Sequence, residues 1–226
     1  MSRQDAKVEL TRTGAVFVLA MRDGENRFNR PFLTALNDAL DEVERSSGPA
    51  ALVTVGAEKF YSNGLDLDWL MASGQGAEFI GDFLAFFARM LSLPLPTVAA
   101  LNGHAFAGGA MFALTHDFRV MRADRGYFCL PEVDLGMPFA PGMNALIIDK
   151  LGRRTAADLV LTGRRIGGEE ALHLRAADEI AAADAVLPRA IARAEALSGK
   201  DRAIYGRLKR DLFAGAIEML KSRKMP

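Results

Sequence analysis

The sequence predicts an α/β fold with a largely parallel sheet, because apolar segments alternate with amphipathic helices through its first half. The expected strands show little alternation of apolar and polar residues, which is typical of strands buried on both faces. They lie at residues 15–21, 50–55, 96–101 and 118–124. After about residue 143 the apolar spacing becomes almost entirely helical. We therefore expect a parallel sheet followed by a helical carboxyl-terminal region.

The helices between these strands follow from the spacing of their apolar residues. Residues 29–44 place Leu36, Leu40 and Val43 on one face, as a core-facing helix does. A second helix is expected near residues 77–92, where phenylalanines recur at helical spacing. The sequence therefore predicts helices that pack one apolar face against the sheet.

The sequence gives no sign of a division into domains. The chain has no internal repeat, low-complexity tract or linker-like segment. We expect one domain over residues 1–226, with an α/β core at about 1–180 and a helical extension at about 181–226. In the extension, Ile204 and Leu208 belong to one apolar stripe.

Composition and charge exclude several classes of function. Lys+Arg and Asp+Glu both total 28, so the formal net charge is zero, and nucleic acid is not expected as a partner. Apolar runs fall short of the ~20 residues that span a bilayer, and the amino terminus lacks the apolar core of a secretory signal. A soluble cytoplasmic protein is therefore expected. The single cysteine, Cys129, excludes an intramolecular disulfide, and the widely spaced histidines suggest no metal site.

Two glycine-containing turns follow two of the expected strands. Gly108-Gly109 lies where a helix begins, although glycine costs about 1 kcal/mol relative to alanine within a helix. The free N–H groups at a helix start can bind an anionic oxygen if no Cβ blocks the approach. A second turn ends at Gly64, with the Leu65 N–H just beyond. These turns could supply two donors to one oxygen, or they could simply be tight connections.

Four segments together carry a family resemblance. They are "KFYSNGLDL", "PLPTVAALNGHAFAGGAMFAL", "YFCLPEVDLGM" and "LGRRTAADLVLTGRRIGGEEALHLRAADEI". Over roughly residues 8–180 the chain resembles the enoyl-CoA hydratase/isomerase, or crotonase, family. The resemblance implies a spiral of ββα repeats with a helical carboxyl-terminal region, and assembly as trimers or dimers of trimers. It also implies an acyl-CoA substrate and no separate cofactor, since coenzyme A is part of the substrate.

The resemblance assigns the backbone N–H groups of Leu65 and Gly108 to an oxyanion hole for the thioester. Family hydratases use two glutamates, and here the first position is Met111, which cannot transfer a proton. The second position matches Glu132. One carboxylate suits a 1,3-proton transfer, so the pattern favours a Δ3,Δ2-enoyl-CoA isomerase with Glu132 as its base. Apolar neighbours are expected to raise the pKa of Glu132.

Other acids leave the assignment of the base open. Dienoyl-CoA isomerases carry a further aspartate about where Ala140 stands, which counts against a two-base mechanism. Some family isomerases place their glutamate in this downstream stretch, so the match at Glu132 rests on alignment. Asp134 is expected on the same face of a strand as Glu132, in a structural role.

The resemblance also suggests residues around the substrate. Five are expected to form the binding surface or to shape it: Asn63, Gly64, Asp66, Gly109 and Met111. Phe83 and Phe87 are expected beside the acyl chain, with core packing as the alternative. Arg27, Lys59 and Arg89 are candidates for the CoA phosphates, with solvated surface charge as the alternative. His104 is interpreted as a packing residue.

The missing hydratase glutamate leaves other functions possible. They are a hydratase-like enzyme of weak or altered activity, a thioester hydrolase that holds water with one carboxylate, and a non-catalytic acyl-CoA-binding subunit. Each differs from the isomerase in the product formed from an enoyl-CoA.

Overall fold

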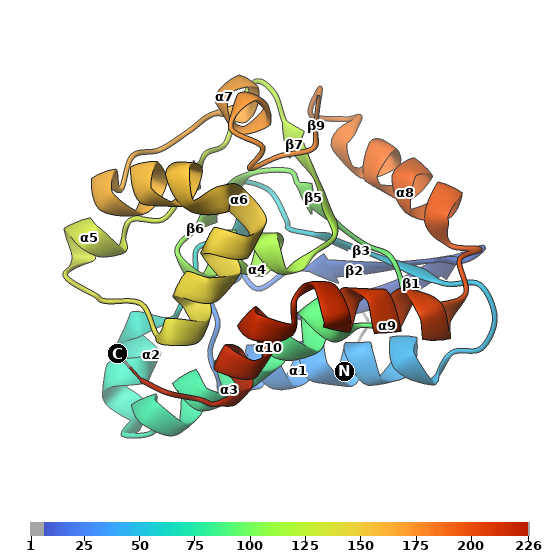
Figure 1. Ribbon diagram of the computed structural model, residues 1–226. Helices are drawn as coiled ribbons and strands as arrows, with labels where there is room; N and C mark the ends of the chain where they lie inside the picture. The colour runs from blue at the N-terminus through green and yellow to red at the C-terminus, as the bar shows by residue number, and fades with distance from the viewer. Residues whose placement is uncertain (1–6, 226) are drawn as a thin grey trace.

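A computed structural model describes residues 7–225. The main layer of the fold is a six-stranded sheet (Figure 1). In spatial order the strands are β1 (Val8–Thr13), β2 (Val16–Met21), β3 (Ala51–Val55), β5 (Thr97–Leu101), β7 (Phe118–Arg122) and β9 (Glu179–Ala181). β1 is antiparallel to β2, and the remaining neighbours are parallel. The four strands expected from the sequence are confirmed, to within two residues at each end.

A second, three-stranded parallel sheet lies beside the first. It consists of β4 (Phe60–Ser62), β6 (His104–Phe106) and β8 (Phe128–Cys129). Each of these strands follows a strand of the main sheet and precedes a helix, so the chain repeats a ββα unit. This arrangement confirms the expected spiral of ββα repeats. The small strands span only two or three residues, too few for a visible period in the sequence.

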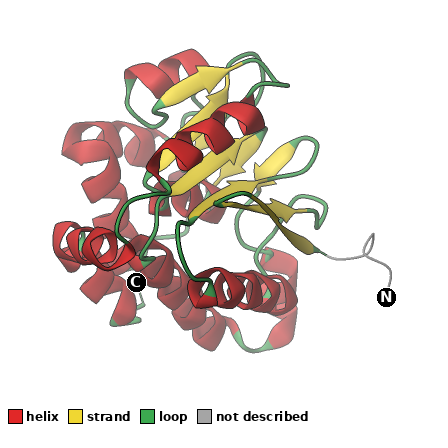
Figure 2. Ribbon diagram, turned by 90° about the vertical axis from the view of Figure 1, so that its right-hand side faces the viewer, coloured by secondary structure: helices red, strands yellow, loops and turns green. Residues whose placement is uncertain are grey.

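Helices surround the two sheets (Figure 2). Those of the α/β part are α1 (Arg30–Arg45), α2 (Leu67–Ser73), α3 (Gly76–Ser92), α4 (Gly108–Thr115), α5 (Glu132–Leu135), α6 (Pro141–Thr162) and α7 (Gly168–His173). The last three are α8 (Val186–Leu197), α9 (Arg202–Leu212) and α10 (Ala214–Lys221). The two helices expected at residues 29–44 and 77–92 correspond to α1 and α3. None of the helices within residues 7–225 combines the length and hydropathy needed to cross a membrane.

The core lies on both faces of the main sheet. On one face α1, α3 and α4 bury an aromatic cluster, in which the ring of Phe28 lies 4.8 Å from Phe83 and 5.7 Å from Phe112. On the other face α8 buries Val186 and Ala190 against the valines and alanines of the strands. Figure 1 shows α8 and α1 on opposite sides of the sheet. Burial on both faces explains why the strands are apolar throughout.

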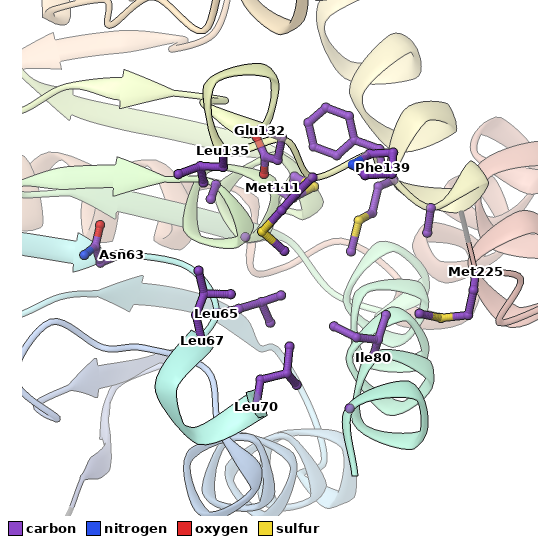
Figure 3. Close-up of a pocket in the computed structure, with 17 residues that line it drawn as sticks. Asn63, Leu65, Leu67, Leu70, Ile80, Met111, Glu132, Leu135, Phe139 and Met225 are labelled. Carbon is purple, nitrogen blue, oxygen red and sulfur yellow. The ribbon is translucent and has the colours of Figure 1, made fainter. Parts of the chain in front are cut away.

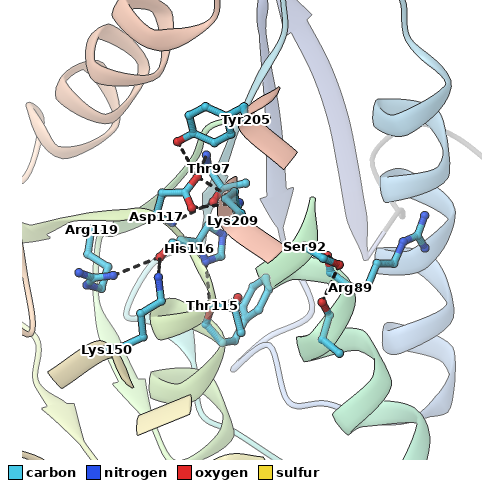
Figure 4. Close-up of polar contacts among 12 residues, drawn as sticks. Arg89, Ser92, Thr97, Thr115, His116, Asp117, Arg119, Lys150, Tyr205 and Lys209 are labelled. Atoms are coloured by element: carbon cyan, nitrogen blue, oxygen red, sulfur yellow. Dashed lines mark hydrogen bonds and ion pairs between the residues drawn. The ribbon is translucent and has the colours of Figure 1, made fainter. Parts of the chain in front are cut away.

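The extension is joined to the core by a buried polar group. Asp117, which precedes β7, accepts hydrogen bonds from the Lys209 Nζ and the Tyr205 hydroxyl of α9, each at 3.1 Å (Figure 4). Asp117 also accepts a bond of 2.9 Å from the Thr97 amide of β5. One carboxylate therefore holds α9 against the edge of two central strands, while the stripe with Ile204 and Leu208 faces outward.

Candidate active site

The two glycine turns lie in contact at the carboxyl ends of β4 and β6. These strands are parallel neighbours, so their following turns lie at the same edge of the small sheet. A Cβ placed on Gly64 would lie 3.0 Å from the Gly108 nitrogen, and one placed on Gly108 would lie 3.4 Å from the Gly64 Cα. The positive φ of Gly64, +80°, also favours glycine there. The fold thus brings together two turns that are about forty residues apart in the sequence.

The amides of Leu65 and Gly108 remain available to a ligand. Phe28 pairs with the peptides on either side of Leu65: its N–H donates to Gly64 O at 2.8 Å, and its carbonyl accepts from Asp66 N at 3.0 Å. The Leu65 N–H is therefore directed away from the pairing with Phe28. Gly108 is the first residue of α4, so its own N–H has no partner within the helix. Within residues 7–225, neither amide donates a hydrogen bond.

Ala107 sets the orientation of the Gly108 amide. Its backbone has φ +50° and ψ −123°, a region that glycine usually occupies. The Ala107 N–H donates to Cys129 O at 3.0 Å, and its carbonyl accepts from Met111 N at 3.0 Å. A residue in such a region costs about 1–3 kcal/mol and is commonly found at functional sites. Sequence reasoning missed Ala107, since only the small residues around it indicated an unusual turn.

The second glycine of the pair has a different role from the one expected. Gly109 is buried, and a Cβ there would lie 2.2 Å from Ser62 O. Glycine is therefore required so that α4 can pack directly against the backbone of β4. Gly109 does not line the cavity described next, and its place among the substrate-binding residues is corrected to a packing position beneath the site.

A cavity of about 310 Å³ opens beside the two amides (Figure 3). It is lined mainly by apolar side chains from the loop before α2, from α2, α3 and α4, from the α5–α6 segment and from the carboxyl-terminal segment. These include Leu65, Leu67, Leu70, Ile80, Met111, Leu135, Phe139, Met143 and Met225. Ala107 and Gly108 also line it. The cavity therefore combines an apolar surface with one focused polar feature, which is typical of a small-molecule site.

Glu132 is the only ionisable side chain among the described residues that line this cavity. Its side chain is almost wholly buried, with the residue 7% exposed, and its Oε2 finds no hydrogen-bond partner within residues 7–225. Burial raises the pKa of Glu132 from 4.5 to about 7. The direction of this shift is the one expected from the sequence, and its cause is desolvation by burial.

The strand expected around Glu132 is absent, and the segment forms the one-turn helix α5 instead. Residues two apart lie on different sides of a helix, so Asp134 does not share the face of Glu132. Asp134 is exposed, and its carboxylate lies close to Gly163. The apolar residues Val133 and Leu135 alternate with the acids and resemble a strand locally, which explains the wrong expectation.

The aromatic residues proposed for the acyl chain belong to the core. Phe83 and Phe87 are fully buried and are not among the lining residues. The Phe83 ring packs against Gly108, since a Cβ added to Gly108 would lie 3.0 Å from the Phe83 Cζ. Ile80, one turn earlier on α3, is the residue that reaches the cavity instead. Helical spacing identified the stripe but not which of its members face the cavity.

Asn63 lies at the polar side of the cavity. Its backbone N–H donates to Glu25 O at 2.9 Å, and its Nδ2 donates to Glu25 Oε2 at 2.8 Å. Asp66 caps α2 by accepting from Trp69 N at 3.1 Å, and it also accepts from Asn29 Nδ2 at 3.0 Å. Asp66 thus steadies the loop that carries Leu65, and it shapes the binding surface rather than lining the cavity.

The three candidate cations lie at different places. Arg27 lies in a neighbouring hollow with Glu25 and Asp66, and forms an ion pair of 2.6 Å with Glu25. Lys59 lines a separate hollow with Arg122 and Arg125. Arg89 joins α3 to α1 through ion pairs with Asp41 and Glu44, so its guanidinium is already engaged. Of the three candidates, Arg27 is the one joined by side-chain contacts to a residue that lines the cavity, by way of Glu25 and Asn63.

Two further sequence interpretations concern Cys129 and His104. The Cys129 thiol is buried, it donates to Gly163 O at 3.1 Å, and burial raises its pKa to about 11, so it is a structural thiol. His104 packs among aromatic rings, with Tyr127 stacked at 5.5 Å. Within residues 7–225, no group of three or more potential ligand side chains is placed to hold a metal ion.

Comparisons with known proteins show which proteins this chain is similar to. A model of the enoyl-CoA hydratase/isomerase family matches residues 11–224. Enoyl-CoA delta isomerase 3 of Arabidopsis thaliana is 35% identical over 223 residues, covering 93% of this chain and 94% of that protein. A putative enoyl-CoA hydratase of Thermus thermophilus is also 35% identical, over 191 residues, covering 80% of this chain and 74% of that protein. The solved structure of an enoyl-CoA isomerase of Mycobacterium tuberculosis (Mtb) superimposes with a TM-score of 0.89 at 28% identity, covering 96% of this chain and 95% of that chain.

Proposed function

Because the chain belongs to the enoyl-CoA hydratase/isomerase family, we propose that it converts 3-enoyl-CoA thioesters into 2-enoyl-CoA thioesters. The observation that carries the proposal is a single buried carboxyl, Glu132, in an apolar cavity that also contains two unpaired amides. The similarity to a delta isomerase over most of both chains supports the same choice.

The reaction requires one proton to move between two carbons. The Glu132 carboxylate removes a proton from C2, and the electrons of the C–H bond move toward the thioester carbonyl. The resulting enolate oxygen accepts hydrogen bonds from the amides of Leu65 and Gly108, which stabilises the negative charge. The electrons then return from the enolate oxygen and form the double bond between C2 and C3, while the C3=C4 π bond opens and its electrons take the proton from the Glu132 carboxylic acid at C4. No proton is gained or lost overall.

The environment of Glu132 suits both halves of this transfer. A group that removes and returns a proton near neutral pH works best with a pKa near the working pH. Burial raises the pKa of Glu132 to about 7, so both its forms are accessible there. The same apolar lining disfavours water beside the enolate, which favours internal proton return over hydration.

Met111 supports isomerisation over hydration. It lines the cavity. By the family resemblance, hydratases have a glutamate at this position. Hydration needs groups that position and activate water, and Glu132 is the only ionisable lining residue within the described chain. A thioether cannot supply the second group.

The test is to incubate the protein with 3-hexenoyl-CoA and, separately, with 2-hexenoyl-CoA. Formation of the conjugated thioester from the first, without 3-hydroxyhexanoyl-CoA from the second, is the expected result. Rapid hydration of 2-hexenoyl-CoA would make the protein a hydratase, and release of free CoA would make it a hydrolase. Tight binding without any product would favour a non-catalytic acyl-CoA-binding subunit.

We also propose that the chain works as a homo-oligomer in the cytoplasm, with a trimer as the expected unit. Helix α9 exposes an apolar stripe of Ile204, Leu208 and Leu212, whose exposed fractions are 61%, 63% and 73%. Three large apolar residues in a row on one helix face form a surface suited to a protein contact. Lys209, which is buried in the ion pair with Asp117, lies on a different face of α9 from the exposed stripe.

A further inference from the structure

The cavity has a polar end and an apolar end, and these are formed by different parts of the chain. Asn63 lies at one side, and Glu25 and Arg27 lie beyond it. Ile80 and Met225 lie at the other side, with Leu65, Met111 and Glu132 between the two ends (Figure 3). On the proposed function, the polar CoA portion of a substrate would therefore lie toward Asn63, and its acyl tail would extend toward Met225.

The segment that carries Met225 is held in place by its own contacts. Helix α10 packs on α3 and α6, with Leu220 fully buried. After this helix the chain turns at Arg223, whose backbone is left-handed with φ +53°. The Arg223 side chain then forms an ion pair of 3.1 Å with Asp82 of α3. This pair links the segment that follows α10 to α3, where Asp82 also pairs with Arg30.

Gly81 makes room for this contact. A Cβ on Gly81 would lie 3.3 Å from the Arg223 Cδ, so the arginine stem lies directly on the bare surface of α3. Ile80 and Asp82 flank this glycine: the first lines the cavity, and the second binds Arg223. One short stretch of α3 thus aligns the segment and presents Met225 beside Ile80.

We infer that Met225, positioned by the Arg223–Asp82 pair, closes the acyl end of the cavity and limits the length of the acyl chain that the enzyme accepts. The inference rests on the proposed function and adds a specificity-determining residue to it. Methionine suits this position, because its unbranched side chain fills an irregular apolar gap and can adjust to different chains. A longer acyl chain must displace the Met225 side chain, whereas a short chain need not reach it.

The test compares kcat/KM for 3-dodecenoyl-CoA with kcat/KM for 3-hexenoyl-CoA. Met225→Ala is expected to raise this ratio by about tenfold, and Met225→Trp to lower it by about tenfold, the scale on which apolar pockets discriminate chain length. Met219→Ala is the matched control, since Met219 lies on α10, is 42% exposed and does not line the cavity. It should leave the ratio unchanged.

A second pair of variants tests the anchor. Arg223→Ala should move the ratio in the same direction as Met225→Ala, and Arg223→Lys should restore part of the original value. Arg207→Ala, which removes an exposed ion pair with Asp211 on α9, is the control for losing an arginine. A ratio unaffected by Arg223→Ala would overturn the positioning role of the pair.

Binding of saturated acyl-CoA separates this inference from the proposed reaction. The ratio of Kd values for hexanoyl-CoA and dodecanoyl-CoA, measured by calorimetry, should shift in Met225→Ala in favour of the longer ligand. If the enzyme isomerises 3-hexenoyl-CoA but neither ratio responds to Met225, the inference fails and the proposed function stands. If no substrate is turned over but the Kd ratio shifts, the role of Met225 at the acyl end of the cavity is supported and the proposed reaction is contradicted.

Discussion

The backbone N–H of Ala107 donates a hydrogen bond of 3.0 Å to the carbonyl of Cys129. Ala107 immediately precedes the Gly108 amide, and Cys129 ends the strand β8 three residues before Glu132. One main-chain contact therefore ties the turn that presents an amide donor to the strand that leads to the carboxyl. Both groups need a defined relative position for the proposed chemistry, and this contact between β6 and β8 supplies it.

The strained backbone of Ala107 leads to the first prediction. Replacing Ala107 with glycine removes the steric cost of its positive φ in the folded state. The greater flexibility that glycine gives the unfolded chain cancels only part of this gain. We expect Ala107→Gly to raise the free energy of unfolding by about 1 kcal/mol, measured by urea denaturation. Ala110→Gly, in the interior of α4, should instead lower it by about 1 kcal/mol. Equal destabilisation by both glycines would show that Ala107 is not strained.

The second prediction concerns the rate. Glu132→Gln keeps the size of the side chain but cannot accept the C2 proton, so kcat for 3-hexenoyl-CoA should fall by about a thousandfold with little change in KM. The control is Asp134→Asn, two residues away and exposed, which should retain kcat within about twofold. Full activity in Glu132→Gln would move the base to another group while leaving the fold as described.

The third prediction is a pH dependence of stability. The pKa of Glu132 is about 7 in the folded protein and 4.5 as its ordinary value, which we take for the unfolded chain. Below about pH 4.5 both states hold the proton, and burial of the acid costs little. Between pH 4.5 and 7 the unfolded state ionises first, so the free energy of unfolding falls as pH rises, by about 3 kcal/mol in total.

Chemical denaturation of the wild type and of Glu132→Gln from pH 4 to 8 measures this effect. The variant has no proton to lose, so the difference in unfolding free energy between it and the wild type should grow toward pH 7 in favour of the variant. Over the same range kcat/KM of the wild type should rise, since the carboxylate is the reactive form. A constant difference in stability across this range would mean that the pKa of Glu132 is not raised.

The fourth prediction concerns assembly. Leu208 lies in the middle of the exposed stripe on α9, and a charge there would oppose burial of the stripe between subunits. We expect Leu208→Glu to reduce the molar mass measured by light scattering to that of smaller species, with unchanged helical circular dichroism. Met71→Glu is the control, because Met71 is 78% exposed on α2, away from the stripe. A monomeric wild type would contradict the proposed assembly.

Local spacing was enough to predict the long elements. β2, β3, β5 and β7 bury both faces, and α1 and α3 bury one, so each carries its pattern within its own segment. The short strands β4, β6 and β8 carry no such pattern, because they are held by pairing with one another rather than by their own residues. The residues around Glu132 form α5 although Val133 and Leu135 alternate with the acids as in a strand, because four residues are too few to distinguish the two periods.

The types of residue at the site could also be inferred from sequence. Leu65, Gly108 and Glu132 were identified from turns and family motifs, and all three line one cavity. The raised pKa of Glu132 followed from its apolar neighbours in the chain. Gly109, Phe83 and Phe87 are buried and do not line the cavity, which for the two phenylalanines corresponds to the core-packing alternative. A helix presents several faces, and spacing alone does not say which face meets a cavity.

The order of apolar residues along the chain therefore determines the long strands and helices, because these depend on local conformation and burial. The family motifs imply the ββα spiral and one candidate base, Glu132. Only the tertiary structure decides which side chains share the cavity, since that depends on contacts between residues far apart in sequence. Ala107 meets Cys129, and Arg223 meets Asp82, through packing that no single segment encodes. These long-range contacts are where the site acquires its geometry.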